Sequence, residues 1–207
     1  MMAITRNHII QYFVRKNSYK TYLEIGCDKN QTFNHISCPF KIGVDPNSGG
    51  NIRLTSDEFF KYNTQKFDLI FIDGLHHYDQ VSLDFKNSLK FLNDNGTIVI
   101  HDMLPNNQIE QIVPFNPNIH GAWTGDVWRL GFDLISRNDI TFKIYMEDYG
   151  VGVVHKGFQE PVFMEKSIKT WSEFLLHKNK LPILSFANQL KSYSSYPPPP
   201  VNMFCRV

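Results

Sequence analysis

Cysteine, net charge and long apolar runs are all scarce in this sequence of 207 residues. Its three cysteines, Cys27, Cys38 and Cys205, are odd in number and lack the spacing of a metal site. This argues against a disulfide framework and predicts a cytoplasmic protein. A formal net charge of +1 gives no electrostatic footprint for nucleic acid. Because no long apolar run opens the chain, we expect neither a signal peptide nor a membrane span.

Glycine is also scarce in the loop that follows the first apolar run, and the glycine content of this loop distinguishes between two possible cofactors. Two apolar runs, 22–25 and 41–44, lead to acidic residues, and Asp45 ends the second. In an open α/β sheet ligands bind at the carboxyl ends of the strands, where a carboxylate suits a ribose diol. A dinucleotide fingerprint needs several glycines, but the first loop has only Gly26 and places Asp28 where another would stand. This acidic loop favours the sulfonium and ammonium of S-adenosylmethionine over the diphosphate of NAD.

Apolar strand patterns alternate with amphipathic helix patterns along the chain, which predicts a Rossmann-like, doubly wound, mostly parallel α/β sheet of seven strands. Expected strands cover 21–25, 41–44, 52–54, 67–72, 97–100, 142–146 and 152–155, and expected helices cover 5–16, 31–36, 55–62, 81–92, 127–136 and 165–177. Thr55 and Glu58 fit a capping box, and Gly96 fits a helix stop. The last two strands should form a hairpin that turns at 148–150.

Two further segments complete the expected organisation. Residues 1–160 should form a cofactor-binding domain, and 161–207 a C-terminal helix and a tail with a polyproline II stretch at Pro197–Pro200. The segment 103–125 is rich in Pro and Asn, so we expect a long loop over the site that acts as a lid for the acceptor.

Several motifs carry a resemblance to a known family: Leu23–Gly26, Val44–Asp45, Thr55–Asp57, Phe71–Tyr78 and Gly96–Asp102, with a less specific match at Gly125–Arg129. In these motifs the chain resembles class I S-adenosylmethionine-dependent methyltransferases, closest to the branch of small-molecule and sugar O-methyltransferases. The resemblance spans roughly residues 20–155 and implies an antiparallel last strand. It also implies that Ser56 and Asp57 meet the adenine, with Asp57 accepting a hydrogen bond from the exocyclic amine. The residues we expect to bind S-adenosylmethionine are Glu24, Gly26, Cys27, Asp45, Ser56, Asp57, Asp73 and His76.

Asp73 and Asp102 each end a buried strand and should converge beside the cofactor loop. Two such carboxylates can bind a divalent cation such as Mg²⁺, or share acid–base work. Met103 stands where metal-dependent relatives carry a further Asn ligand. The alternative is structural: Asp73 would bond backbone amides, and Asp102 would cap a turn.

Three histidines, His76, His77 and His101, should cluster around those carboxylates. A histidine can deprotonate an acceptor hydroxyl, and neighbouring carboxylates stabilise the imidazolium that forms. We favour His77 as the base, with His101 and Asp102 completing the catalytic group. One histidine could instead stack on the adenine and another be structural. Asp79 fits a helix N-cap.

Trp123, Trp128 and Arg129 flank the long loop. Aromatic faces beside a polar rim suit a sugar or an aromatic acceptor, although the helical spacing of Trp128 equally fits a core residue. The sequence therefore predicts an O-methyltransferase that acts on a hydroxyl of a small molecule, with sugars among the candidates. An inactive cofactor-binding partner module and an NAD-dependent oxidoreductase are the alternatives. We expect no nucleic-acid or membrane partner, and the sequence leaves a homo-oligomer open.

Overall fold

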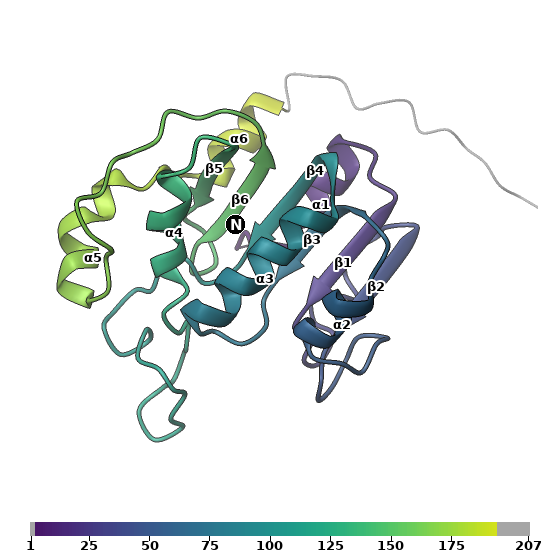
Figure 1. Cartoon of the computed structure of the whole chain (residues 1–207), viewed down its shortest axis with the longest axis horizontal. Coiled ribbons are helices and arrows are strands. Elements are labelled where there is room, and N and C mark those ends of the chain that lie inside the picture. Colours follow the sequence, from purple (N-terminus) through teal and green to yellow (C-terminus); the bar gives the residue numbers. More distant parts are fainter. Residues whose placement is uncertain (1–2, 194–207) are drawn as a thin grey trace, which may run out of the picture.

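The computed structural model describes residues 3–193, and within them seven strands form one sheet in the order β2-β1-β3-β4-β6-β5-β7 (Figure 1). The strands are β1 Thr21–Ile25, β2 Phe40–Val44, β3 Phe67–Ile72, β4 Leu92–Ile100, β5 Ile140–Tyr145, β6 Val151–Lys156 and β7 Ile183–Leu184. The helices are α1 Arg6–Lys16, α2 Ser56–Tyr62, α3 Tyr78–Phe91, α4 Trp128–Ile135, α5 Trp171–His177 and α6 Phe186–Tyr193, with a 3₁₀ turn at Lys178–Lys180.

The strand directions confirm the predicted fold class. β1 pairs in parallel with β2 and β3, and β3 pairs in parallel with β4. β6 is the reversed strand, because it runs antiparallel to both β4 and β5. The last, short strand β7 then pairs in parallel with β5 at the edge of the sheet.

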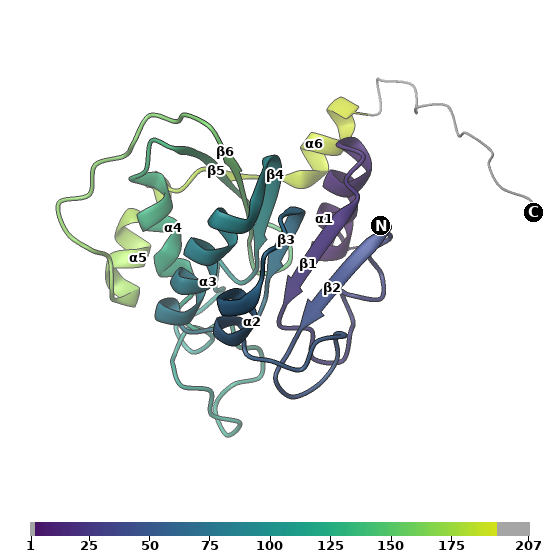
Figure 2. The same ribbon diagram turned by 45° about the vertical axis from the view of Figure 1, so that its right-hand side comes forward.

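Helices cover both faces of the sheet, and the alternation of side chains along the strands explains why (Figure 2). In β3, Ile70 and Ile72 face the core formed with α2, α3, α4 and α5, whereas Leu69 and Phe71 face the core formed with α1 and α6. A strand that is buried on both faces is apolar at nearly every position. Both bounds of β3 could therefore be predicted from the sequence.

The expected strand at 52–54 and the expected helix at 31–36 were both wrong. Ile52 makes only a single bridge to Val44, because Gly49 and Gly50 have positive φ angles and fold the chain back for just that contact. Residues 28–35 form turns. Asn30 is left-handed there (φ 61°), and Asp28, Asn30 and Asn34 in this segment favour turns over helix. The seventh strand is β7 instead.

Two predicted helix ends also differ from the structure. The capping box of Thr55 and Glu58 is present at α2, as expected. Gly96 does not end α3. It lies inside β4, near the point where the pairing of β4 with β3 changes register, between Phe67 and Leu69 of β3. Helix α5 begins six residues later than expected, because the capping box of Thr170 and Glu173 defines its start. The polyproline prediction at 197–200 and Cys205 lie outside the described residues.

The order of the strands places the site. β1 connects to β2 on one side, and β3 then lies on the other side of β1, so the topology switches there. Ligands of doubly wound sheets bind at such a switch, outside the carboxyl ends of the strands. Among residues 3–193, no helix has the length and apolar character needed to cross a membrane.

Candidate functional site

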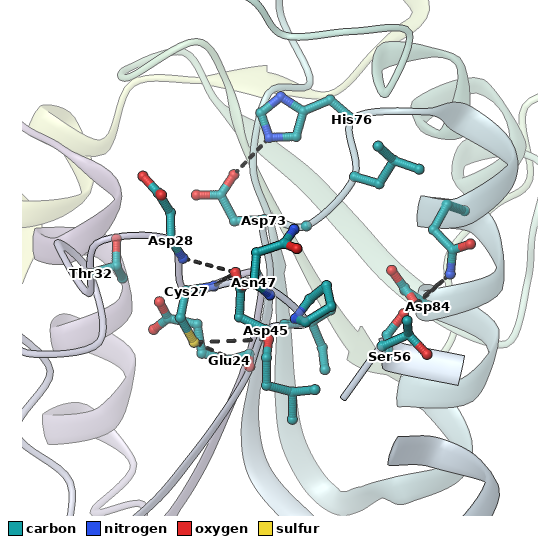
Figure 3. A pocket seen from close by; sticks show the side chains of 18 of the residues that line it. Glu24, Cys27, Asp28, Thr32, Asp45, Asn47, Ser56, Asp73, His76 and Asp84 are labelled. Carbon is teal, nitrogen blue, oxygen red and sulfur yellow. Dashed lines mark hydrogen bonds and ion pairs between the residues drawn. The ribbon is translucent and has the colours of Figure 1, made fainter. Parts of the chain in front are cut away.

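A cavity of about 690 Å³ opens at the carboxyl ends of β1, β2 and β3 (Figure 3). All eight residues expected to bind the cofactor line it: Glu24, Gly26, Cys27, Asp45, Ser56, Asp57, Asp73 and His76. Asp28 and Asp84 add two further carboxylates, while Arg6 and Lys29 contribute the basic side chains of the lining. The cavity is therefore acidic, as the glycine-poor loop indicated.

The turn after β1 requires the one glycine that it has. Gly26 adopts φ 85°, and a Cβ at this position would lie 2.2 Å from the backbone oxygen of Asp73. The first loop and the end of β3 can approach each other only because that side chain is absent. Next to it, Cys27 is buried, and burial together with the charge of Glu24 raises the pKa of its thiol. A neutral, buried thiol packs as a small apolar side chain.

Asp45 holds the floor of the cavity together. One carboxylate oxygen accepts backbone hydrogen bonds from Cys27 and Asp28, both at 3.0 Å, and the other accepts from Asn47 and Ser48. Burial alone would raise the pKa of Asp45, but these hydrogen bonds outweigh it and lower the pKa. The residue expected to bind a ribose thus also fixes the two loops on which the ribose would rest.

Glu24 is a deeply buried acid of the cavity wall, with 1% of its surface exposed. Tyr22 Oη donates a hydrogen bond of 2.5 Å to Glu24 Oε2. Burial raises the pKa of Glu24 to about 8, with a further contribution from the nearby charge of Asp73. The folded protein therefore keeps a proton on Glu24 at neutral pH.

The start of α2 and the middle of α3 meet along one wall. Gln80 Nε2 lies 3.2 Å from Ser56 Oγ, 3.1 Å from Asp57 Oδ1 and 3.2 Å from Asp84 Oδ1. The capping box places Ser56 and Asp57 in the first turn of α2, with their side chains toward the cavity. A single amide thus links the two residues expected at the adenine with a third acid, Asp84.

A second polar cluster lies where β3, β4, α1 and the β5–β6 turn meet. Arg6 Nη1 lies 3.0 Å from Asp73 Oδ2, and Arg6 Nε lies 3.2 Å from Asp148 Oδ2. Burial alone would raise the pKa of Asp73, but the positive charges of His101 and Arg6 hold it well below its usual range. Asp102 closes the cluster in a left-handed conformation (φ 62°).

His101 lies inside this cluster, only 3% exposed, and does not line the cavity. Its Nδ1 is 3.2 Å from Asp73 Oδ1 and 3.1 Å from Asp102 Oδ2, and Arg6 Nη1 is 2.8 Å away. A neutral His101 ring could accept a hydrogen bond from Arg6 Nη1. Burial disfavours the charged ring, but the carboxylates Asp102 and Asp73 outweigh it and raise the pKa of His101 well above its usual value. The raised pKa favours the protonated ring, whose charge is balanced by the carboxylates of Asp73 and Asp102.

His76 and His77 have different surroundings. His76 lines the cavity, with Nε2 3.5 Å from Asp73 Oδ1 and Nδ1 3.2 Å from Asp102 Oδ2. Burial alone would lower the pKa of His76, but the hydrogen bond to Asp73 and the charge of Asp102 raise it. His77 does not line the cavity; it is the N-cap residue of α3, a position that we had expected Asp79 to take.

The loop 103–125 contains no helix or strand and docks on His76. The Trp123 ring stacks on His76 with 5.0 Å between centroids, and the His76 backbone oxygen accepts a hydrogen bond from Asp126 N. Trp128, by contrast, is completely buried against Phe174, so it is a core residue. Of the aromatic residues considered for an acceptor, Trp123 is the one that lies beside the site.

Asp73, His76 and Asp102 offer ligand atoms that all lie within 4.8 Å of one another. Their donor chemistry suits a divalent cation. The charge at this position is already balanced, however, because Arg6 and the His101 ring contact the carboxylates. Met103, at the position of the additional ligand in metal-dependent relatives, is fully buried. The cluster thus has suitable atoms for a metal, but its cationic neighbours do not fit one.

Four residues of the site were not predicted from the sequence: Arg6, Gln80, Asp84 and Asp148. Arg6 carried one usable signal: a basic residue in the first turn of a helix opposes the helix dipole and calls for a compensating partner. Asp84 carried another, because this acid lies three residues after the apolar Val81, at helical spacing. Asp148 gave no local signal beyond the hairpin turn in which it lies.

Comparisons with known proteins agree with this fold. Residues 14–103 match the model of a family described as "Methyltransferase domain". No curated protein matches the sequence. Among solved structures, a Staphylococcus aureus protein provisionally assigned as a caffeoyl-CoA O-methyltransferase is similar, with a TM-score of 0.58, 18% identity and coverage of 76% of this chain and 85% of that one.

Two other solved structures are similar to a comparable extent. The methyltransferase PaMTH1 of Podospora anserina, bound to S-adenosylhomocysteine (SAH), has a TM-score of 0.55 and 16% identity, with coverage of 77% of this chain and 80% of that one. The O-methyltransferase of Bacillus cereus in complex with SAH has a TM-score of 0.53 and 14% identity, with coverage of 75% and 83%. At such identities the structural likeness concerns the fold, and together with the family match it confirms the resemblance found in the sequence.

The raised pKa of Glu24 predicts how stability depends on pH. Between about pH 4.5 and 8 the folded state keeps the Glu24 proton, whereas the unfolded state releases it, so stability falls as pH rises through this window. Glu24→Gln removes the effect. In thermal unfolding, the Tm of this variant relative to wild type should increase by several degrees between about pH 5 and about pH 9. The exposed substitution Glu165→Gln is the control. Parallel curves for wild type and Glu24→Gln would contradict the assignment.

Proposed function

We propose that this chain, a class I S-adenosylmethionine-dependent methyltransferase by its family match and fold, transfers a methyl group to a hydroxyl of a small molecule. The acidic cavity at the switch point carries the proposal. A sulfonium and an ammonium gain from its carboxylates, whereas the diphosphate of a dinucleotide would be repelled. The single glycine of the first loop argues in the same direction, since the backbone approaches a diphosphate closely only over several glycines.

Different residues of the cavity would bind different parts of the cofactor. Asp45 would hold the ribose, and Ser56 and Asp57 the adenine. Glu24 and the first loop would face the amino-acid end. When bound, S-adenosylmethionine supplies an electrophilic methyl group for in-line displacement by the acceptor oxygen. The protein then has to align the acceptor and remove its proton.

His76 is the residue that we propose as the base. It lines the cavity, and its Nδ1 is oriented by Asp102 and by the backbone oxygen of Trp123, each at 3.2 Å. Nε2 can then take the hydroxyl proton, and Asp73 stabilises the imidazolium that forms. His101 and Asp102 belong to the catalytic group as positioning residues, since both are buried behind His76.

The long loop is proposed to provide the acceptor site. Trp123 stacks on His76 and presents a half-buried ring beside it, and Phe115 and His120 extend the aromatic group. A flat apolar face next to polar groups suits a sugar or an aromatic alcohol. All of the proposed cofactor and catalytic residues fall within 1–160, the domain expected from the sequence, with the lid at 103–125.

A divalent cation bound by Asp73, His76 and Asp102 is the second candidate for activating the acceptor. The convergence of their ligand atoms favours it. Such an ion would polarise the acceptor oxygen and lower the pKa of its hydroxyl. Arg6 and His101 already provide positive charge at this position, so we propose transfer without a required exchangeable cation.

Cofactor binding should depend on Asp45. Asp45→Ala removes the expected ribose contacts and releases the two loops, and calorimetry with SAH should show affinity weakened by about 1–3 kcal/mol. Asp94→Ala, which changes an exposed acid remote from the cavity, is the control. Unchanged SAH affinity in Asp45→Ala would contradict the ribose assignment.

Turnover should depend on His76 more than on His77. Transfer of a labelled methyl group from S-adenosylmethionine, screened over sugars and aromatic alcohols, identifies an acceptor for the assay. His76→Ala should then lower kcat by roughly 10²–10⁴-fold, the usual contribution of a general base, with a much smaller change in SAH affinity. His77→Ala should retain most activity. If His77→Ala instead abolishes turnover, His77 is the base.

Chelation separates the two ways of activating the acceptor. In excess EDTA the wild-type enzyme should keep its full rate, because Arg6 and His101 supply the positive charge that an ion would bring. Loss of activity that added Mg²⁺ restores would establish the cation at Asp73, His76 and Asp102 instead.

A further inference from the structure

Asp84 is a buried acid on the cavity side of α3 that the proposed mechanism does not use. It lies in the middle of the helix, only 1% exposed, between apolar residues that pack into the core. It nevertheless lines the cavity (Figure 3), where it lies beside Ser56, across from Asp28 and Thr32.

The two carboxylate oxygens of Asp84 differ in their partners. Oδ1 accepts a hydrogen bond from Gln80 Nε2 at 3.2 Å. Oδ2 is buried and makes no hydrogen bond of good geometry to any described residue, although the nearby Ser56 hydroxyl lowers the pKa of Asp84 and partly offsets burial. Burial raises the pKa of Asp84 to about 6, so the group is ionised at slightly alkaline pH. A buried carboxylate oxygen without a donor is costly, and such an atom on a cavity wall indicates that a ligand supplies the donor.

The neighbours of Asp84 indicate which part of the ligand it meets. Gln80 links Asp84 to Ser56 and Asp57, the pair expected at the adenine. Gly74 lies between Asp84 and the first loop, and a Cβ there would come within 4.0 Å of Asp84 Oδ2. Gly74 therefore places no side chain between Oδ2 and the first loop.

We propose that Asp84 Oδ2 accepts a hydrogen bond from the exocyclic amine of the cofactor adenine, so that Asp84 and Asp57 read its two hydrogens together. This inference rests on the proposed S-adenosylmethionine cofactor. An ionised carboxylate only accepts hydrogen bonds, so this pair selects a base with an amine at that position and rejects one with a carbonyl oxygen. Asp84 is thus a specificity residue for the base.

The test compares SAH with S-inosylhomocysteine, which carries a carbonyl oxygen in place of the amine. Calorimetry should show that the wild type prefers SAH by roughly 10²-fold or more, because the analogue leaves two carboxylates without donors. Asp84→Asn offers an amide donor to the carbonyl, so it should reduce this preference at least tenfold. The Asp84→Ser side chain ends one bond short of the carboxylate oxygens, so it withdraws the acceptor without offering the amide donor. It should weaken SAH binding roughly tenfold, with little change for the analogue. Asp79→Asn, exposed on the same helix, should change neither affinity.

Other results of these titrations would contradict either the role of Asp84 or the cofactor assignment. An equal loss of both ligands in Asp84→Asn and Asp84→Ser would make Asp84 merely structural and overturn the proposal. An unchanged preference in the two variants would overturn it as well. If the wild type fails to bind SAH at all, the proposed cofactor itself is wrong, and the inference about Asp84 fails with it. If the wild type binds SAH but does not discriminate against the analogue, only the inference about Asp84 fails.

Discussion

The carboxyl end of the sheet depends on how its buried carboxylates are paired with cationic side chains. Asp73, Asp102 and Asp148 come from the ends of two strands and from a hairpin turn, and Arg6 and His101 lie between them. Charges removed from water are stable only when paired with good geometry. Arg6 therefore does more than neutralise charge: it ties the start of α1 to the end of β3 and to the β5–β6 turn. The position of His76 then follows, because Asp73 and Asp102 hold its ring from two sides.

A separate set of contacts holds the loops at one end of the cavity. Asp45 accepts four backbone hydrogen bonds from the loops after β1 and β2, and Gly26 allows the first loop to touch the end of β3. The opposite wall is built from side chains of α2 and α3 that share the Gln80 amide. A ligand with a cationic end and an amine-bearing base would satisfy both walls, which is the physical core of the S-adenosylmethionine assignment.

Local sequence patterns predicted the parts of the fold that depend on local physics. The apolar run of β3, the capping box at Thr55 and the hairpin turn near 148 were all found, and so were the acids at the strand ends. The errors arose where tertiary contacts decide. Ile52 makes one bridge and not a strand, and Gly96 lies in β4 at a register shift. Asp84 and Arg6 belong to the site only because helices distant in sequence pack beside it. No periodicity shows which helix face borders a cavity.

The central claim is that the acidic cavity accepts S-adenosylmethionine and not a dinucleotide. Calorimetric titration of the wild-type protein with SAH and, separately, with NAD tests this most directly. The account predicts saturable binding of one SAH per chain and no measurable binding of NAD at the same concentrations. Binding of NAD without binding of SAH would contradict it.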